Sequence, residues 1–238
     1  MAYKRVLLKL SGEALKEDSD AILSGDALAK MADMVKVIHE SGVQVCIVIG
    51  AGNIWRGKIA SEAGMDRVQA DYMGMMGTVI NAVALSSRLR QIGVDSIVTS
   101  AISAIEGITV AYDDKVADKA MNEGKVVFLS GGTGKPFFTT DTAATMRAIA
   151  LNCDAILMGK NGVEGVYDKD PRQNKDAKFF PVISYQEMIK LNLQIMDITA
   201  LELIKDKNIK VCVFRMDEDN FIKAAKGEHI GTICQKGE

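Results

Sequence analysis

Six short apolar runs, separated by longer amphipathic or polar stretches, constrain the fold of this chain more than any other feature. Runs of this length, rich in branched residues, are typical of strands that are buried on both faces. They lie at residues 6–10, 43–50, 96–100, 125–130, 155–159 and 210–214.

Helical patterns occupy several of the intervening stretches. Residues 141–151 and 199–205 have such patterns and precede strands. Between the first two runs, apolar residues keep helical spacing at Leu28, Met31, Val35 and Ile38, with Ser24 or Asp26 as the cap and Ser41-Gly42 as the stop. Alternating strands and helices predict an α/β fold, a three-layer α/β/α sandwich around a mostly parallel sheet. Because no repeat or flexible linker interrupts residues 1–238, we expect one domain whose two lobes share the sheet.

Composition excludes several classes of function. The 238 residues carry a formal net charge of −2, so no global field would attract nucleic acid or an anionic membrane. The apolar segment near Met1 is too short for a signal peptide, and no later run is long enough to span a membrane, which predicts a cytoplasmic protein. The four cysteines lack the CxxC spacing of zinc sites, and we expect buried thiols at Cys46, Cys153, Cys212 and Cys234.

Three familiar motifs are only partly matched. GGTGKPFF at 131–138 has Pro136 where a Walker A loop needs Ser or Thr. GAGNIWRG at 50–57 has Trp55 in place of the third glycine of a dinucleotide fingerprint. DKDP at 168–171 lacks the glycine and terminal glutamate of a calcium loop. The sequence therefore argues against a P-loop, a nicotinamide site and an EF-hand.

Glycine-containing strand ends give the strongest functional signal: KLSG at 9–12, GAGN at 50–53 and SGGTG at 130–134. Ligands bind at the carboxyl ends of strands in open α/β sheets, and small residues let backbone N–H groups approach phosphate oxygens. Each loop alone is better explained as a tight turn, but three of them with Lys9 and Arg56 indicate several phosphates. Lys9 ends an apolar strand, where its ammonium group needs an anion unless it extends to solvent.

These motifs, in their order along the chain, resemble those of bacterial uridylate kinases of the amino acid kinase family. The resemblance covers nearly the whole chain and implies transfer of the γ-phosphoryl group of ATP to UMP, giving UDP and ADP in pyrimidine nucleotide biosynthesis. The matching segments are KLSGEAL, VIGAGNIWRG, AGMDRVQADYMGM, GTGKPFFTTD, GVEGVYDKDP and MDITA. GTGKPFFTTD and ADYMGM are specific to the enzymes that act on UMP. The resemblance also implies an acceptor lobe at about 1–150 and an ATP lobe at about 151–238.

The resemblance assigns roles to particular residues of the donor side. Lys9, Arg56 and Asp154 are implied to be catalytic, with Asp154 orienting Lys9. Asp141 or Asp197 is implied to position substrate or metal, and an N-cap or turn carboxylate is an equal alternative for both. Mg²⁺ is expected to enter with ATP, without a dedicated metal site in the protein. The implied ATP-binding residues are Lys9, Leu10, Ser11, Gly12, Gly52, Arg56, Asn161, Tyr167 and Asp170. Among them, Asn161, Tyr167 and Asp170 are implied to hold the ATP nucleoside.

The acceptor side is assigned in the same way. Asp71 is implied to accept hydrogen bonds from the ribose hydroxyls, and Thr140 to bind the phosphate or the base. The implied UMP-binding residues are Gly50, Ala51, Asp71, Thr133, Gly134, Lys135, Pro136, Phe137, Phe138, Thr139 and Thr140.

The chain departs from the family pattern at several positions. Ala51 replaces a glycine, and Lys135 replaces an asparagine and puts a cation beside UMP. Residues 17–22, EDSDAI, replace a glycine-rich stretch linked to GTP activation, so we do not expect GTP to activate this chain; UTP remains a candidate inhibitor. Family members of this type are homohexamers, and an interface is suggested for the apolar residues Met73, Met75, Met76, Val79, Val83 and Leu85, although core packing explains them nearly as well.

Two other functions compete with this one. A different amino acid kinase, acting on a carboxylate, carbamate or aspartate, would share the ATP motifs but not the PFFTTD run and Asp71. A nucleotide sensor would keep the pocket without the chemistry, and the presence of Lys9 and Arg56 argues against it.

Overall fold

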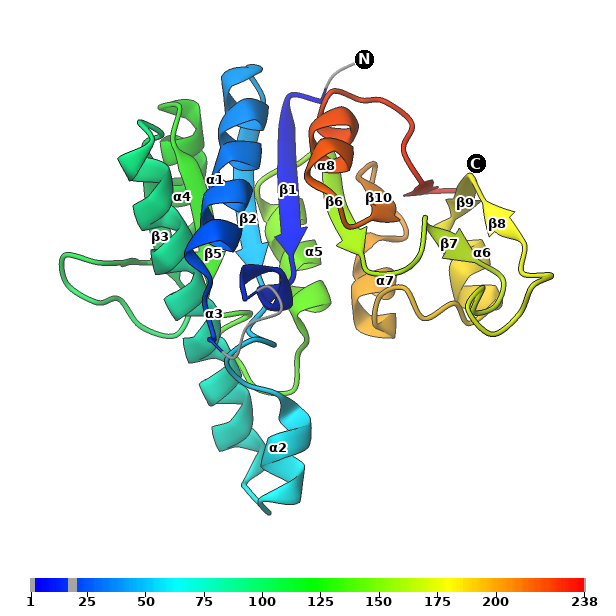
Figure 1. Cartoon of the computed structure of the whole chain (residues 1–238), viewed down its shortest axis with the longest axis horizontal. Coiled ribbons are helices and arrows are strands. Elements are labelled where there is room, and N and C mark those ends of the chain that lie inside the picture. Colours follow the sequence, from blue (N-terminus) through cyan, green and yellow to red (C-terminus); the bar gives the residue numbers. More distant parts are fainter. Residues whose placement is uncertain (1–2, 17–20, 238) are drawn as a thin grey trace.

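Nine strands form one sheet through the centre of the computed structural model, which describes residues 3–16 and 21–237 (Figure 1). The strand order is β4-β3-β5-β2-β1-β6-β10-β11-β9, and each neighbouring pair is parallel except β10 and β11. The mostly parallel sheet is therefore confirmed. The strands are β1 (Arg5–Leu10), β2 (Gln44–Ile49), β3 (Ser96–Ser100), β4 (Val110–Ala111), β5 (Val126–Ser130), β6 (Ala155–Lys160), β9 (Val182–Ser184), β10 (Lys210–Arg215) and β11 (Thr232–Gln235).

Helices cover both faces of the sheet, which confirms the three-layer α/β/α sandwich. Side chains of α1, α3 and α8 pack into the core on one face, and those of α4, α5, α6 and α7 into the core on the other. α2 and the first part of α3 extend beyond the carboxyl end of β1 (Figure 1). The helices are α1 (Gly25–Glu40), α2 (Gly57–Glu62), α3 (Arg67–Gln91), α4 (Asp114–Asn122), α5 (Thr140–Ala150), α6 (Tyr185–Lys190), α7 (Ile198–Ile204), α8 (Glu218–Ala225) and a short 3-10 helix (Gly12–Leu15).

Alternation along β1 divides its side chains between the two cores. Val6, Leu8 and Leu10 lie in the core beneath α1, whereas Leu7 lies in the core beneath α5. Since successive side chains of a strand point to opposite faces, Lys9 shares the face of Leu7. It therefore lies at the end of β1 on the side that α5 covers.

Helix caps follow from short polar side chains at the expected places. Ser24 caps α1, because its hydroxyl accepts a hydrogen bond from the amide of Ala27 at 3.3 Å. Thr139 caps α5 and Asp197 caps α7, and each helix begins one residue before the predicted start. The predicted strands and helices are thus confirmed.

Residues 160–181, the longest polar and turn-rich stretch of the sequence, contain regular structure. Two short strands, β7 (Val166–Tyr167) and β8 (Phe179–Phe180), pair antiparallel within it. The rings of Tyr167 and Phe179 meet edge to face at 5.3 Å between centroids. The pairing joins residues 166–167 to residues 179–180.

The two halves of the sheet come from successive parts of the chain. β4, β3, β5, β2 and β1 come from residues before 150, and β6, β10, β11 and β9 come from residues after it. All four cysteines are buried and free, as predicted. Within the described residues, no helix is both long enough and apolar enough to cross a membrane.

Candidate functional site

The loops after β1 and β2 approach each other closely at the carboxyl edge of the sheet. A Cβ atom on Gly12 would lie 2.4 Å from both the carbonyl oxygen of Gly50 and Oδ1 of Asn53, so only glycine fits there. Asn81 fixes the same region from α3, because its Nδ2 donates to the oxygens of Gly50 and Asn53, each at 2.8 Å. The loops after β1 and β2 are therefore held together by close packing and by hydrogen bonds from Asn81.

Lys9 forms an ion pair at this edge. Its Nζ lies 2.8 Å from Oδ1 of Asp141, and the two side chains are only 19% and 18% exposed. Asp141 belongs to the first turn of α5, so the N-terminus of that helix also faces Lys9. The pair fixes the ammonium group beside a helix end that favours anions, as binding of a phosphoryl group requires.

Asp154 is far from Lys9, and its predicted role as the carboxylate that orients the lysine is wrong. It precedes β6, which runs parallel to β1 with Ala155 opposite Val6. Asp154 therefore lies at the amino edge of the sheet, where its Oδ2 accepts from the amides of Lys4 and Arg5 at 2.7 and 2.9 Å. Asp141 is the carboxylate that contacts Lys9 instead.

Arg56 connects the loops after β1 and β2. Its Nη2 and Nε lie 2.6 and 3.1 Å from Oε1 of Glu13, and its Nε also donates to the carbonyl of Gly52. The arginine side chain is 59% exposed and accessible to a ligand. Leu10, by contrast, is fully buried, and its carbonyl accepts from the amide of Gly50 at 2.9 Å, so this predicted ATP-binding residue is not exposed to a ligand.

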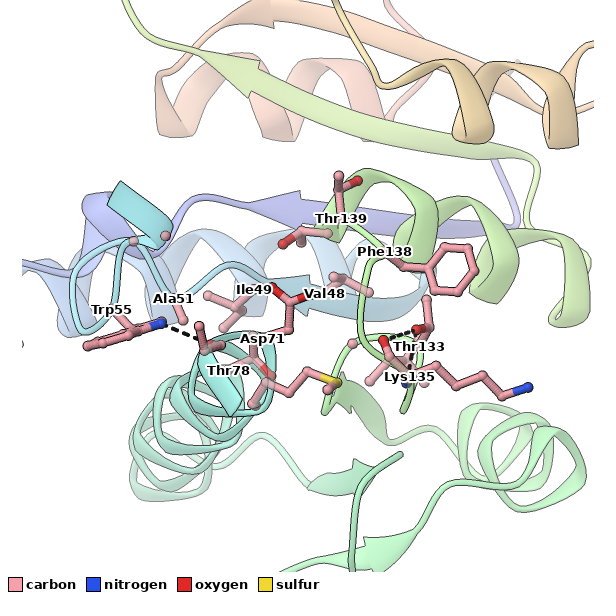
Figure 2. Close-up of a pocket in the computed structure, with 18 residues that line it drawn as sticks. Val48, Ile49, Ala51, Trp55, Asp71, Thr78, Thr133, Lys135, Phe138 and Thr139 are labelled. Carbon is pink, nitrogen blue, oxygen red and sulfur yellow. Dashed lines mark hydrogen bonds between the residues drawn. The ribbon is translucent and has the colours of Figure 1, made fainter. Parts of the chain in front are cut away.

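A cavity of about 310 Å³ lies beside β2 and β5 and collects most of the predicted acceptor residues (Figure 2). Gly50, Gly134, Pro136 and Phe137 are not among its lining residues. Figure 2 shows the ammonium group of Lys135 pointing away from Asp71. The predicted residues that line the cavity are Ala51, Asp71, Thr133, Lys135, Phe138, Thr139 and Thr140.

Asp71 already has hydrogen-bond partners in this structure. Its Oδ2 accepts from the amide of Phe137 at 2.7 Å, and its Oδ1 accepts from Nε of Arg67 at 2.8 Å. Phe137 has a positive φ of 72°, which is uncommon for a non-glycine residue. Asp71 therefore anchors the loop after β5 to α3, and a ribose would have to share or exchange these bonds.

A second cavity, of about 500 Å³, lies beyond β6. Asn161, Tyr167 and Asp170 all line it, so the structure brings together the three residues predicted for the ATP nucleoside. Nε and Nη2 of Arg172 donate to the two oxygens of Asp170, each at 3.0 Å, and these bonds lower the pKa of that carboxyl group. Asp170 is therefore an ionised acceptor on the cavity wall.

Asp197 joins two helices. Burial acts to raise its pKa, but hydrogen bonds from Thr139, from Thr142 and from the amide of Ala200 outweigh burial and lower it. The carboxylate caps α7 and accepts from Thr139, the cap of α5, and from Thr142 within that helix. These contacts match the capping alternative and place Asp197 in a supporting position near Asp141.

Several lining residues were missed in the sequence. Trp55, Met75 and Thr78 line the first cavity, and Lys160 lines the second. Trp55 donates from Nε1 to the carbonyl of Ala70 at 2.9 Å, and Thr78 Oγ1 accepts from the amide of Gly131 at 2.9 Å. Helical spacing from Asp71 would have indicated Met75 and Thr78.

The strand order places Lys9 between the two cavities. β2 and β5 lie on one side of β1, and β6 lies on the other. An anchored lysine between two cavities, at the carboxyl edge of a parallel sheet, is an arrangement suited to phosphoryl transfer. The chain belongs to the amino acid kinase family, whose model matches residues 4–215.

Full-length relatives define the branch of that family. The chain is 49% identical over 234 residues to a uridylate kinase of Mycoplasma capricolum, covering 98% of each chain. It is 46% identical to a uridylate kinase of Streptococcus thermophilus, covering 99% of this chain and 97% of that one.

Solved structures give the same result. The UMP kinase of Ureaplasma parvum superposes with a TM-score of 0.93 at 39% identity, over 99% of this chain and 100% of that one. The UMP kinase of Bacillus anthracis superposes with a TM-score of 0.95 at 38% identity, over 100% and 98%. The predicted amino acid kinase fold is confirmed.

Proposed function

We propose that this chain transfers the γ-phosphoryl group of ATP to UMP and releases UDP and ADP. The observation that carries the proposal is the position of the Lys9–Asp141 pair between a cavity with the predicted UMP residues and a cavity with the predicted ATP residues. The similar proteins named as uridylate kinases support the choice of acceptor.

Positioning and charge stabilisation account for the chemistry. A phosphate oxygen of UMP attacks the γ-phosphorus, and the bond to the bridging oxygen breaks, leaving its electron pair on ADP. Lys9, held by Asp141, stabilises the charge on the transferred group, and Arg56 lies at the same edge of the sheet. The phosphate of UMP is already ionised, so no general base is needed from the protein.

Mg²⁺ fits this site as a partner of ATP. Mg²⁺ usually binds substrate phosphates, waters and one or two carboxylates, not a cage of protein groups. Among the described residues, no three His, Cys, Asp or Glu side chains are placed to hold a metal ion. Asp141 and Asp197 line one cavity and would be the carboxylates nearest to a Mg²⁺-bound phosphate, where the ion would neutralise phosphate charge.

The test is ATP consumption with Mg²⁺ and a panel of UMP, dUMP, CMP, acetylglutamate and carbamate. We expect ADP release that depends on UMP and requires Mg²⁺. Turnover with acetylglutamate or carbamate instead would leave the fold and overturn the acceptor. Nucleotide binding without turnover on any of the five would favour the sensor.

Other features of the proposal concern organisation and control. The split of the sheet supports an acceptor lobe at about 1–150 and an ATP lobe at about 151–238. We propose a cytoplasmic role in pyrimidine nucleotide biosynthesis, with inhibition by UTP because it shares uracil and ribose with UMP. We propose no activation by GTP, given the acidic segment 17–22, of which residues 17–20 lie outside the described residues.

A homohexamer is part of the same proposal, and an exposed apolar groove supports it. Met76, Ile80, Ile105 and Ile108 are each about half exposed and line this groove, together with Val79 and Val83. Of the residues suggested for the interface, Met75, Val79 and Leu85 are instead buried within the chain, and of these three Val79 alone lines the groove. An apolar patch of this kind is typical of protein–protein interfaces.

Replacing Ile80 by glutamate is expected to reduce the assembly to smaller oligomers without unfolding the chain. Ile80 is 48% exposed, so the charge is tolerated in the isolated chain but not in a buried interface. Light scattering after size-exclusion chromatography measures the mass. The control is Val116→Glu, an exposed apolar position on α4, outside the groove. A hexamer of unchanged mass in Ile80→Glu would place the interface elsewhere.

A further inference from the structure

Lys160 ends β6 on the same face of the sheet as Lys9. Met158 pairs with Lys9 in the parallel register, and Lys160 lies two residues further toward the carboxyl edge. Residues two apart in a strand share a face, so both lysines point toward the side that α5 and α7 cover. Lys160 is thus a second cation at the edge where the phosphates of ATP are expected.

The ammonium group of Lys160 has no acidic partner. Its Nζ donates to the carbonyl of Ile195 at 2.9 Å, and in the described part of the chain no carboxylate oxygen lies within 4.0 Å of it. Burial lowers its pKa, repulsion from Lys9 lowers it further, and Asp141 partly opposes these effects. A half-buried cation near another cation is costly unless an anion joins them.

Two cavities meet at this side chain. One contains Asn161, Tyr167 and Asp170, and the other contains Asp141 and Asp197; Lys160 lines both. A nucleotide with its nucleoside in the first cavity and its γ-phosphate at Lys9 must extend its phosphates past Lys160. The intermediate position belongs to the β-phosphate.

We propose that Lys160 binds the β-phosphate of the nucleotide donor and stabilises it as the leaving group. The proposal rests on the proposed function, in which the bond between the γ-phosphorus and the β–γ bridging oxygen breaks. The electron pair stays on the β-phosphate of ADP, where negative charge increases. Lys160 opposes that charge while Lys9 acts on the transferred group.

The experiment compares binding of ADP and AMP by calorimetry in wild type, Lys160→Met and Lys160→Arg. We expect Lys160→Met to weaken ADP binding about 10- to 50-fold, the usual effect of losing one charged hydrogen bond. AMP lacks the β-phosphate, so its affinity is expected to stay within about twofold. Lys160→Arg, which keeps the charge, is expected to recover part of the loss.

A purely structural role for Lys160 gives a different result. Residues 191–195 line the nucleoside cavity, so loss of the bond to Ile195 alone would weaken AMP and ADP equally. That outcome, or unchanged ADP binding in Lys160→Met, would overturn the proposal. Lys210→Met, at an exposed lysine that begins β10, is the matched control and should match wild type. Failure of wild type to bind ADP would instead overturn the proposed function.

Discussion

Replacement of Lys9 by methionine is expected to lower kcat by about 10³-fold or more, because its charge is needed mainly in the transition state. Methionine keeps an aliphatic side chain on the face of β1 that Leu7 shares and removes the ammonium group. A 10³-fold loss corresponds to about 4 kcal/mol of transition-state stabilisation. Steady-state ADP release with saturating ATP and UMP gives kcat directly.

The fold is expected to survive this change. The cost falls on Asp141, whose buried Oδ1 loses its ion-pair partner, although the side chain as a whole is 18% exposed. A loss of about 1–2 kcal/mol would lower Tm by only a few degrees in a domain of this size. Lys210→Met provides a charge-matched control far from the site. A kcat within about tenfold of wild type, in a folded Lys9→Met protein, would remove Lys9 from the mechanism.

Local patterns were enough to predict the architecture. Each apolar run is short, and the signal for a buried strand lies entirely within its own residues. The strands β1, β2, β3, β5, β6 and β10 were therefore predictable. The Ser24 cap and the spacing of α1 are likewise local. The short strands β4, β7, β8, β9 and β11 have two to four residues each and gave no comparable signal.

α3 shows a second limit of local patterns. Gly74 and Gly77 weaken its helical signal, and a Cβ on Gly77 would lie 2.8 Å from Cβ of Ala51. The glycine is there for close packing between α3 and the loop after β2, a contact between distant parts of the sequence. The position of α3 against this loop could therefore not be predicted from either segment alone.

Lys160 was missed although the sequence contained its signal. It follows the apolar run 155–159, as Lys9 interrupts the end of the run 6–10. The same reasoning about a lysine at the carboxyl end of a buried strand applies to both. The predicted run stopped at residue 159, one residue before the end of β6, so the position of Lys160 on the sheet was overlooked.

The structure places Asp141 and Asp154 at opposite edges of the sheet, and the direction of the parallel strands explains why. A residue just before a parallel strand lies at the amino edge, whereas a residue just before a helix that follows a strand lies at the carboxyl edge. Asp154 is of the first kind and Asp141 of the second. Lys9 lies at the carboxyl edge, so substitutions of Asp141 and of Asp154 can be compared as a matched pair.

Asp141→Asn is expected to lower kcat about 10²-fold and change Tm little, because it removes the charge that orients Lys9 and keeps the shape of the side chain. Asp154→Ala is expected to lower Tm and to leave kcat nearly unchanged. It removes the acceptor for the amides of Lys4 and Arg5, at a cost of about 1–3 kcal/mol, and lowers Tm by several degrees. Its kcat should stay within about threefold of wild type, since Asp154 lies at the opposite edge of the sheet.

Measuring kcat and Tm for both variants separates the two roles. Loss of turnover in folded Asp154→Ala would restore Asp154 as the orienting carboxylate and require a rearrangement of β1 and β6 in the active state. Full turnover in Asp141→Asn would show that the 2.8 Å ion pair with Lys9 is not needed for catalysis. The expected pattern, a kinetic defect in one and a stability defect in the other, follows from the direction of β6 alone, because a parallel strand cannot bring its first residue to the edge where phosphates bind.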